Sequence, residues 1–246
     1  MYHYLNDKAT VKRMRHVAGN LLQTLCRYLK EDFDISARFY LVGSGAKNLI
    51  LQNEDEPVDL DYNLEIVKCR DFTDCKYIKE CVRKAFNKTL RQSGLWDCED
   101  STSTLTSKKM FWNGKKIVSW LPNTLTICYT YTNLSPWGLG SYKDDVIPFS
   151  IDICITQKGK SGSIHRLIHE KNGSSIDDKY YWNIAPNTKR LKEKVDYIKS
   201  RGKWHLVRRQ YLAIKNRYLQ RNDTNHSSFI CYAEAVNNVY NERNNW

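Results

Sequence analysis

The chain has 246 residues and a formal net charge of +12, and 41% of its residues are hydrophobic. This length allows one large or two small domains, and the apolar content excludes an intrinsically disordered chain. No apolar run approaches the roughly 18–20 residues of a membrane span, and the first residues lack the hydrophobic block of a signal peptide. We therefore expect a cytoplasmic protein that has no membrane partner.

The eight cysteines do not indicate a disulfide framework or a zinc site. They form no Cys-x-x-Cys pair, and Cys26, Cys128 and Cys154 lie within apolar helix or strand patterns. In a reducing compartment such residues act as small buried hydrophobic side chains. We expect free thiols.

The first third of the chain predicts a helix, a strand and a sharp turn. Apolar residues recur at helical spacing over 8–30, and 38–42 is typical of a short buried strand. This strand leads into Gly43-Ser44-Gly45, which is predicted to turn into a helix, and 52–57 is predicted to be an acidic loop. Backbone N–H groups and a hydroxyl at such a turn suit a phosphate.

Residues 58–66 alternate between apolar and polar side chains, which predicts a strand with one buried face. The apolar positions are Val58, Leu60, Tyr62, Leu64 and Ile66, and the polar positions are Asp59, Asp61, Asn63 and Glu65. Asp59 and Asp61 therefore point to the same side. Two adjacent carboxylates repel each other unless a cation lies between them, so this pattern favours a hard divalent ion.

The middle of the chain predicts one more helix and several strands. The helix ends near Gln92 and has Asp71 or Thr73 as its N-cap. The segments that follow are a loop at 97–107, a hairpin at 109–120 that turns at Asn113-Gly114, a strand at 125–131, a long connection at 133–145 and a strand at 148–155. Asp152 is the only charged residue of this last strand.

These features together resemble the active-site pattern of the nucleotidyltransferase superfamily, which includes DNA polymerase beta and the cyclic-oligonucleotide synthases. The resemblance is carried by Gly43-Ser44 after a strand, by Asp59-Leu60-Asp61 on the next strand, and by Asp152 as the third carboxylate. No nearer subfamily is identified. The fourteen residues between Ser44 and Asp59 lie at the long end of the family pattern.

The C-terminal part is strongly basic. Residues 157–246 carry 18 Lys and Arg against 8 Asp and Glu, and 12 of these basic residues lie within 189–221. A helix is predicted from about Gly202 to Gln220, with Arg208 and Lys215 seven positions apart on one shoulder of its apolar face. His165 and His169 are predicted to lie four apart on another helix, as structural or surface residues rather than zinc ligands.

We therefore predict an α/β (α+β) fold in which helices flank a mixed sheet. The predicted domains are a catalytic domain at 1–156 and a basic helical subdomain at 157–246. The resemblance implies that Asp59, Asp61 and Asp152 are catalytic residues and bind two Mg²⁺ or Mn²⁺ ions. It also implies that Gly43, Ser44, Lys47, Arg208 and Lys215 contact the nucleotide phosphates.

The implied activity is transfer of a nucleoside monophosphate from a nucleoside triphosphate, such as ATP, to a hydroxyl, with release of pyrophosphate. A second nucleotide, an RNA 3′ end, an antibiotic and a protein side chain are all compatible acceptors, and the basic segment favours a polyanion. The alternative from another class is a non-catalytic nucleic-acid-binding protein that binds through its basic helices.

Overall fold

The computed structural model describes residues 1–5, 8–54, 56–112, 117–119, 148–159, 161–173, 177–223 and 225–246. The chain divides into two compact units, each built from separate segments. The sheet unit comprises Asp7–Val42 and Pro57–Ile184. The helical unit comprises Met1–Asn6, Gly43–Glu56 and Ala185–Trp246.

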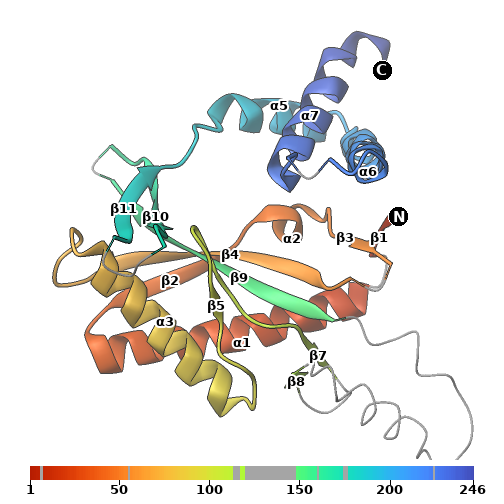
Figure 1. The fold of residues 1–246 in the computed structure, drawn as a ribbon. Coiled ribbons are helices and arrows are strands. Elements are labelled where there is room, and N and C mark those ends of the chain that lie inside the picture. The colour runs from red at the N-terminus through yellow and green to blue at the C-terminus, as the bar shows by residue number, and fades with distance from the viewer. Residues whose placement is uncertain are drawn as a thin grey trace, which may run out of the picture. The chain divides into compact units, whose positions relative to one another are not determined.

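Two helices cover one face of the sheet in the sheet unit (Figure 1). They are α1 (Lys8–Phe33) and α3 (Cys75–Gln92), and they pack against each other. Each helix buries an apolar stripe, which in α3 includes Ile78, Val82 and Phe86. The N-cap of α3 is Asp74, whose side chain accepts a hydrogen bond from the Tyr77 N–H group, and not the predicted Asp71 or Thr73.

The sheet has the strand order β11-β10-β9-β4-β2. The bounds of these strands in chain order are β2 (Ser36–Leu41), β4 (Val58–Lys68), β9 (Phe149–Lys158), β10 (Ile164–Glu170) and β11 (Lys179–Ile184). The short strands β5 (Glu99–Asp100), β6 (Leu105–Thr106), β7 (Met110–Trp112) and β8 (Ile117–Ser119) extend it. Strands β4 and β9 are parallel and adjacent, whereas β2 pairs with β4, and β10 with β9, in antiparallel fashion.

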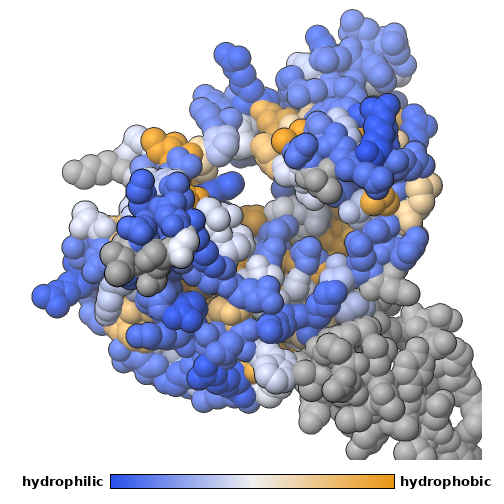
Figure 2. Space-filling model, in the orientation of Figure 1, coloured by the Kyte–Doolittle hydropathy of each residue, from blue (hydrophilic) through white to orange (hydrophobic). Residues whose placement is uncertain are grey.

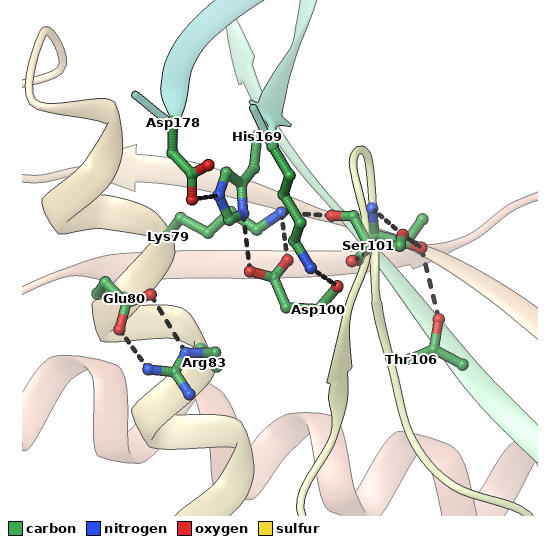
Figure 3. A network of polar contacts seen from close by, with 10 residues as sticks. Lys79, Glu80, Arg83, Asp100, Ser101, Thr106, His169 and Asp178 are labelled. Carbon is green, nitrogen blue, oxygen red and sulfur yellow. Dashed lines mark hydrogen bonds and ion pairs between the residues drawn. The ribbon is translucent and has the colours of Figure 1, made fainter. Parts of the chain in front are cut away.

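A network of buried polar side chains joins α3 to the strands beside it (Figure 3). The Nζ atom of Lys79 lies 2.7 Å from Oδ1 of Asp100 and donates a 2.8 Å hydrogen bond to the Ser101 carbonyl. The His169 ring bridges two carboxylates, with Nδ1 2.8 Å from Asp100 and Nε2 2.9 Å from Asp178. The side chains of Lys79 and His169 are almost fully buried, so the interior of this region depends on the Lys79–Asp100 ion pair and on hydrogen bonds between buried polar groups.

The helical unit combines three C-terminal helices with two short strands and a five-residue helix. The helices are α5 (Lys189–Ser200), α6 (Trp204–Gln220) and α7 (Ser228–Asn241), followed by the 3₁₀ turn η3 (Arg243–Asn245). Strand β1 (Tyr2–Tyr4) pairs with β3 (Leu51–Asn53), which follows α2 (Gly43–Lys47). The buried core of the unit includes Leu49 of the α2–β3 connection together with Val207 and Val236. Figure 2 shows mainly hydrophilic side chains over α6 and α7.

The predicted fold class is confirmed: a mixed sheet with flanking helices is followed by C-terminal helices. The compact units divide the chain differently from the predicted domains 1–156 and 157–246, because the sheet continues to Ile184 and the helical unit includes two N-terminal segments. His165 and His169 lie on β10, so the helix predicted for them is wrong. Their segment pairs with β11 over six residues, and this pairing decides its conformation.

Some predicted elements fall partly or wholly outside the described residues. The two strands of the 109–120 hairpin pair as predicted, but its turn lies outside the described ranges, as do the strand at 125–131 and the connection at 133–145. All cysteines in the described part of the chain are free thiols. None of the described helices is long and apolar enough to cross a lipid bilayer.

Candidate functional site

The three predicted carboxylates lie on one face of the sheet. Asp59 and Asp61 belong to β4, and Asp152 belongs to the adjacent parallel strand β9. Asp61 is the register partner of Asp152, and Asp59 is the register partner of Ser150. Register partners on neighbouring strands point to the same side, and alternate residues along a strand share a face. The three carboxylates therefore lie opposite the face that carries the fully buried Leu60.

Ser150 lies beside the carboxylates and was not predicted as a site residue. Its hydroxyl donates a hydrogen bond to Oδ1 of Asp59, and its side chain is buried although Asp59 is exposed. A signal was present in the sequence, because Ser150 precedes Asp152 by two positions in an otherwise apolar strand. This spacing places both polar side chains on the same face.

Asp152 lies in an environment that opposes its ionisation. Burial raises the pKa of Asp152, and the nearby charge of Asp59 raises it further, while a hydrogen bond with the Thr106 side chain partly offsets both effects. Its Oδ1 atom is buried and has no hydrogen-bond partner among the described residues. A buried carboxylate oxygen without a partner is costly unless a cation or a proton compensates it.

The donor set fits a hard divalent cation. Mg²⁺ and Mn²⁺ prefer carboxylate oxygens, and the unpaired Oδ1 atom of Asp152 offers one in a buried position. Asp59 and Asp61 add two more carboxylates on the same face. Within the described ranges, no three His, Cys, Asp or Glu side chains form a group that could hold a metal ion by themselves, so the fit rests on the type of donor and on the shared sheet face.

Replacing Asp152 with asparagine is expected to raise the melting temperature of the metal-free protein near neutral pH. Since the pKa of Asp152 is raised in the folded state, the folded chain binds this proton more tightly than the unfolded chain does. The resulting stability is present at low pH. It is lost as the pH rises from the ordinary carboxyl pKa of 3.8 through the raised pKa of Asp152 in the folded state. The neutral amide avoids this loss of stability. In thermal unfolding in EDTA at pH 7, the Asp152→Asn variant should therefore have the higher melting temperature.

The exposed Asp177 serves as the control, because its replacement by asparagine removes a carboxylate that is already in solvent. This substitution should leave the melting temperature unchanged. Added Mg²⁺ should stabilise the wild type more than the Asp152→Asn variant. A melting temperature for Asp152→Asn at or below that of the wild type in EDTA would show that the carboxylate is not destabilising there.

The predicted phosphate-binding residues near the turn belong to the helical unit. Gly43, the first residue of α2, has a φ of 59°, which is a conformation that glycine adopts without strain. The Ser44 carbonyl accepts a 3.0 Å hydrogen bond from the Leu49 N–H group and closes the helix. Lys47 donates from Nζ to the Gly43 carbonyl at 3.0 Å, and its Nζ lies 5.0 Å from the centre of the Tyr232 ring.

Arg208 and Lys215 both contact the N-terminal strand of the helical unit. The Cζ atom of Arg208 lies 3.9 Å from the centre of the Tyr4 ring, and its Nη1 atom donates to the carbonyl of Asn48. The Nζ atom of Lys215 lies 4.6 Å from the centre of the Tyr2 ring. Neither tyrosine was predicted as a site residue, because contacts between residues some two hundred positions apart leave no periodic signal in the sequence.

The predicted site residues thus form two groups. Asp59, Asp61 and Asp152 lie in the sheet unit, and the five predicted phosphate-binding residues lie in the helical unit. Each group is gathered within its own unit: the carboxylates share one sheet face, and Arg208 bonds to the residue that follows α2. The chemical roles of all these residues remain predictions.

No protein-family model and no curated protein sequence matches the chain. Similarity is found among solved structures. The Vibrio cholerae DncV structure in its 3′-deoxy ATP bound form matches with a TM-score of 0.52 at 14% sequence identity, over 97% of this chain and 53% of that one. Its GTP bound form matches with a TM-score of 0.51 at 15% identity over the same shares.

A third structure, that of the Vibrio cholerae DncV cyclic AMP-GMP synthase in complex with nonhydrolyzable GTP, matches with a TM-score of 0.50 at 13% identity. This match covers 84% of this chain and 46% of that one. The chain therefore spans about half the length of the structures that it resembles. At these identities the similarity concerns the fold, and it confirms the resemblance inferred from the three carboxylates and the Gly-Ser turn. The chain therefore has the fold of these DncV structures, a mixed sheet with flanking helices followed by C-terminal helices.

Proposed function

We propose that this protein is a metal-dependent nucleotidyltransferase, which transfers a nucleoside monophosphate from a nucleoside triphosphate to a hydroxyl. The observation that carries the proposal is the pairing of Asp61 with Asp152 on parallel neighbouring strands, with Asp59 on the same face. Such a set of hard oxygen donors suits Mg²⁺ or Mn²⁺ bound together with a triphosphate. The nucleotidyltransferase fold supports this reading.

In the proposed reaction the acceptor oxygen forms a bond to the α-phosphorus, and the bond from this phosphorus to the oxygen that bridges to the β-phosphate breaks. Pyrophosphate leaves, and Asp152 accepts the proton of the attacking hydroxyl. Asp59 and Asp61 would hold the ion that accompanies the triphosphate, and with Asp152 they would hold a second one. When bound, the two ions neutralise phosphate charge and favour in-line attack.

The helical unit supplies the groups proposed to bind phosphate. Ser44 offers a hydroxyl, and the backbone at Gly43 can approach a ligand closely because glycine has no side chain. Lys47, Arg208 and Lys215 supply positive charge from the same unit. Charge-assisted hydrogen bonds to phosphate are about twice as strong as neutral ones, so these cations suit the β- and γ-phosphates.

The acceptor we propose is a second nucleotide. The basic segment 189–221 favours a polyanionic partner, and several triphosphates or an RNA 3′ end meet that requirement. One of the similar structures is that of a cyclic AMP-GMP synthase, which favours a nucleotide acceptor. A small-molecule or protein acceptor is the alternative within the same reaction class.

The proposal is tested by incubating the protein with Mg²⁺ or Mn²⁺ and labelled nucleoside triphosphates, singly and in pairs, with and without pooled RNA. We expect pyrophosphate release and a new nucleotide product without RNA, and neither of these in EDTA. A product that requires RNA would instead indicate a terminal transferase, and label on the protein itself would indicate self-modification. Absence of pyrophosphate release under every condition, antibiotic acceptors included, would refute the enzymatic proposal.

One observation favours a second function. Residues 189–221 contain twelve basic residues and only two acidic ones, and this excess of positive charge suits binding to a nucleic-acid backbone. A protein that only binds nucleic acid would retain RNA in EDTA and after Asp61→Asn substitution. Its affinity would fall steeply with salt, with a slope of roughly 0.7–0.9 per phosphate contacted.

A further inference from the structure

Arg208 connects two parts of the helical unit that are far apart in the sequence. Its guanidinium stacks on the ring of Tyr4 at 3.9 Å from Cζ to the ring centre, and its Nη1 donates to the carbonyl of Asn48, 160 positions away. Asn48 directly follows α2 and has a φ of 56°. A residue in this left-handed conformation commonly ends a helix, and a cation there also meets the negative end of the helix dipole.

The chemistry of this contact is specific to arginine. A planar guanidinium can lie flat on an aromatic ring and still donate hydrogen bonds in its own plane, whereas a lysine ammonium is a compact charge that cannot do both at once. Arg208 therefore joins the N-terminal strand to the end of the helix that carries Ser44.

Strand β1 is itself held from both sides. The Tyr4 hydroxyl donates a 2.7 Å hydrogen bond to the carbonyl of Arg208, so this tyrosine contacts both the side chain and the backbone of the same residue. The amide of Asn216 on α6 makes two hydrogen bonds to the backbone of Tyr2, at 2.7 and 3.1 Å. The other edge of β1 pairs with β3, which follows α2. The ring beneath Arg208 is thus fixed in place.

We propose that Arg208 and Tyr4 are positioning residues, which hold α2 so that Ser44 meets the triphosphate in a single geometry. This inference rests on the proposed nucleotidyltransferase function. Besides the positive charge that it supplies, Arg208 acts through the Asn48 carbonyl, and Tyr4 acts by fixing the plane of the guanidinium. It follows that Tyr4, which is uncharged and is not one of the proposed phosphate-binding residues, affects the affinity for the nucleotide.

The first part of the test does not require activity. Amide hydrogen exchange over residues 43–49 is measured in the wild type and in the Arg208→Lys, Tyr4→Leu and Tyr4→Phe variants. We expect faster exchange in Arg208→Lys and Tyr4→Leu, since each loses the stacked guanidinium, and near wild-type exchange in Tyr4→Phe, which keeps the ring. Unchanged exchange in Arg208→Lys and Tyr4→Leu would overturn the proposal.

Arg243 provides the matched control. It stacks on Tyr240 at 4.5 Å from Cζ to the ring centre and donates to the Tyr240 carbonyl at 3.1 Å, so it makes the same kinds of contact in the same unit. Replacing it with alanine should leave exchange over 43–49 unchanged. Faster exchange there after Arg243→Ala would show general loosening of the unit, which would contradict a specific positioning role.

The second part measures steady-state kinetics on the same variants. We expect KM for the nucleoside triphosphate to rise about tenfold in Arg208→Lys and Tyr4→Leu while kcat changes little, because weaker ground-state binding raises KM alone. Tyr4→Phe, which keeps the aromatic ring, should have a KM close to that of the wild type. If Arg208 acts only as a positive charge near phosphate, Arg208→Lys retains affinity and Tyr4→Leu has no effect, which would overturn its positioning role. A wild type without transferase activity refutes the proposed function, and the exchange result still decides whether Arg208 and Tyr4 hold α2.

Discussion

Replacing Asp61 with asparagine is expected to lower the rate of nucleotide transfer by about 10³-fold, which corresponds to about 4 kcal/mol of lost transition-state stabilisation. Asp61 is the register partner of Asp152 on the parallel neighbouring strand, so its carboxylate belongs to the group proposed to bind the metal ions. The amide keeps the shape of the side chain but loses the charge that attracts a divalent cation. Pyrophosphate release at saturating Mg²⁺ and nucleotide measures the effect.

Glu65 provides a matched control on the same strand. It lies four residues after Asp61 on the same face of β4 and forms an ion pair with Arg38, with 2.8 Å between Nη2 and Oε1. Glu65→Gln also converts a carboxylate to an amide, but Glu65 is paired with Arg38 and is not among the residues proposed to bind the metal ions. It should keep transfer within a few-fold of wild type. Transfer by Asp61→Asn at a rate similar to that of Glu65→Gln would refute the proposed role of Asp61.

Replacing Lys79 with methionine is expected to destabilise the sheet unit by about 3–5 kcal/mol, or roughly 6–20 °C in melting temperature. Burial lowers the pKa of Lys79, and the carboxylate of Asp100 opposes this effect, so the folded structure depends on the pairing of the two charges. Methionine fills the same space but leaves the Asp100 carboxylate in a largely buried position without this cation (Figure 3). Thermal and denaturant unfolding measure the loss.

Lys84 on the same helix is the control, because its side chain is exposed. Lys84→Met should change the free energy of unfolding by less than about 0.5 kcal/mol. Replacing Lys79 and Asp100 together by apolar residues should be less harmful than replacing Lys79 alone, since the Asp100 carboxylate is then removed with its cation and the His169 ring keeps its bond to Asp178. A change below about 1 kcal/mol for Lys79→Met would mean that water or another cation already compensates Asp100.

The elements with strong local periodicity were predictable from the sequence. The helix predicted at 8–30 is α1, the alternating strand at 58–66 is β4, and the strand around Asp152 is β9. In each case the buried apolar positions follow the predicted period, because the side chains that face the core repeat every two or every three to four residues. The predicted loop at 97–107 instead contains β5 and β6, whose two-residue strands are too short to leave a pattern.

Predictions of the site were of two kinds. Placing Asp59 and Asp61 on one face required only the alternation of a strand. That Asp61 and Asp152 are register partners is a long-range contact, which the alternation made plausible but could not establish. Ser150 and Tyr4 were missed because their importance lies in single hydrogen bonds and a ring contact, and neither changes the local hydrophobic pattern.

Local order along the chain determined the helix α1, the strands β4 and β9, the acidic face of β4 and the concentration of positive charge in 189–221. Only the tertiary structure decided that residues 164–184 join the sheet, that the Gly43-Ser44 turn belongs to the same compact unit as the C-terminal helices, and that Arg208 bonds to Asn48. The physical reason is that local periodicity reports which side of an element is buried. It carries no record of the partner, which is chosen by backbone pairing and side-chain contacts between residues far apart in the chain.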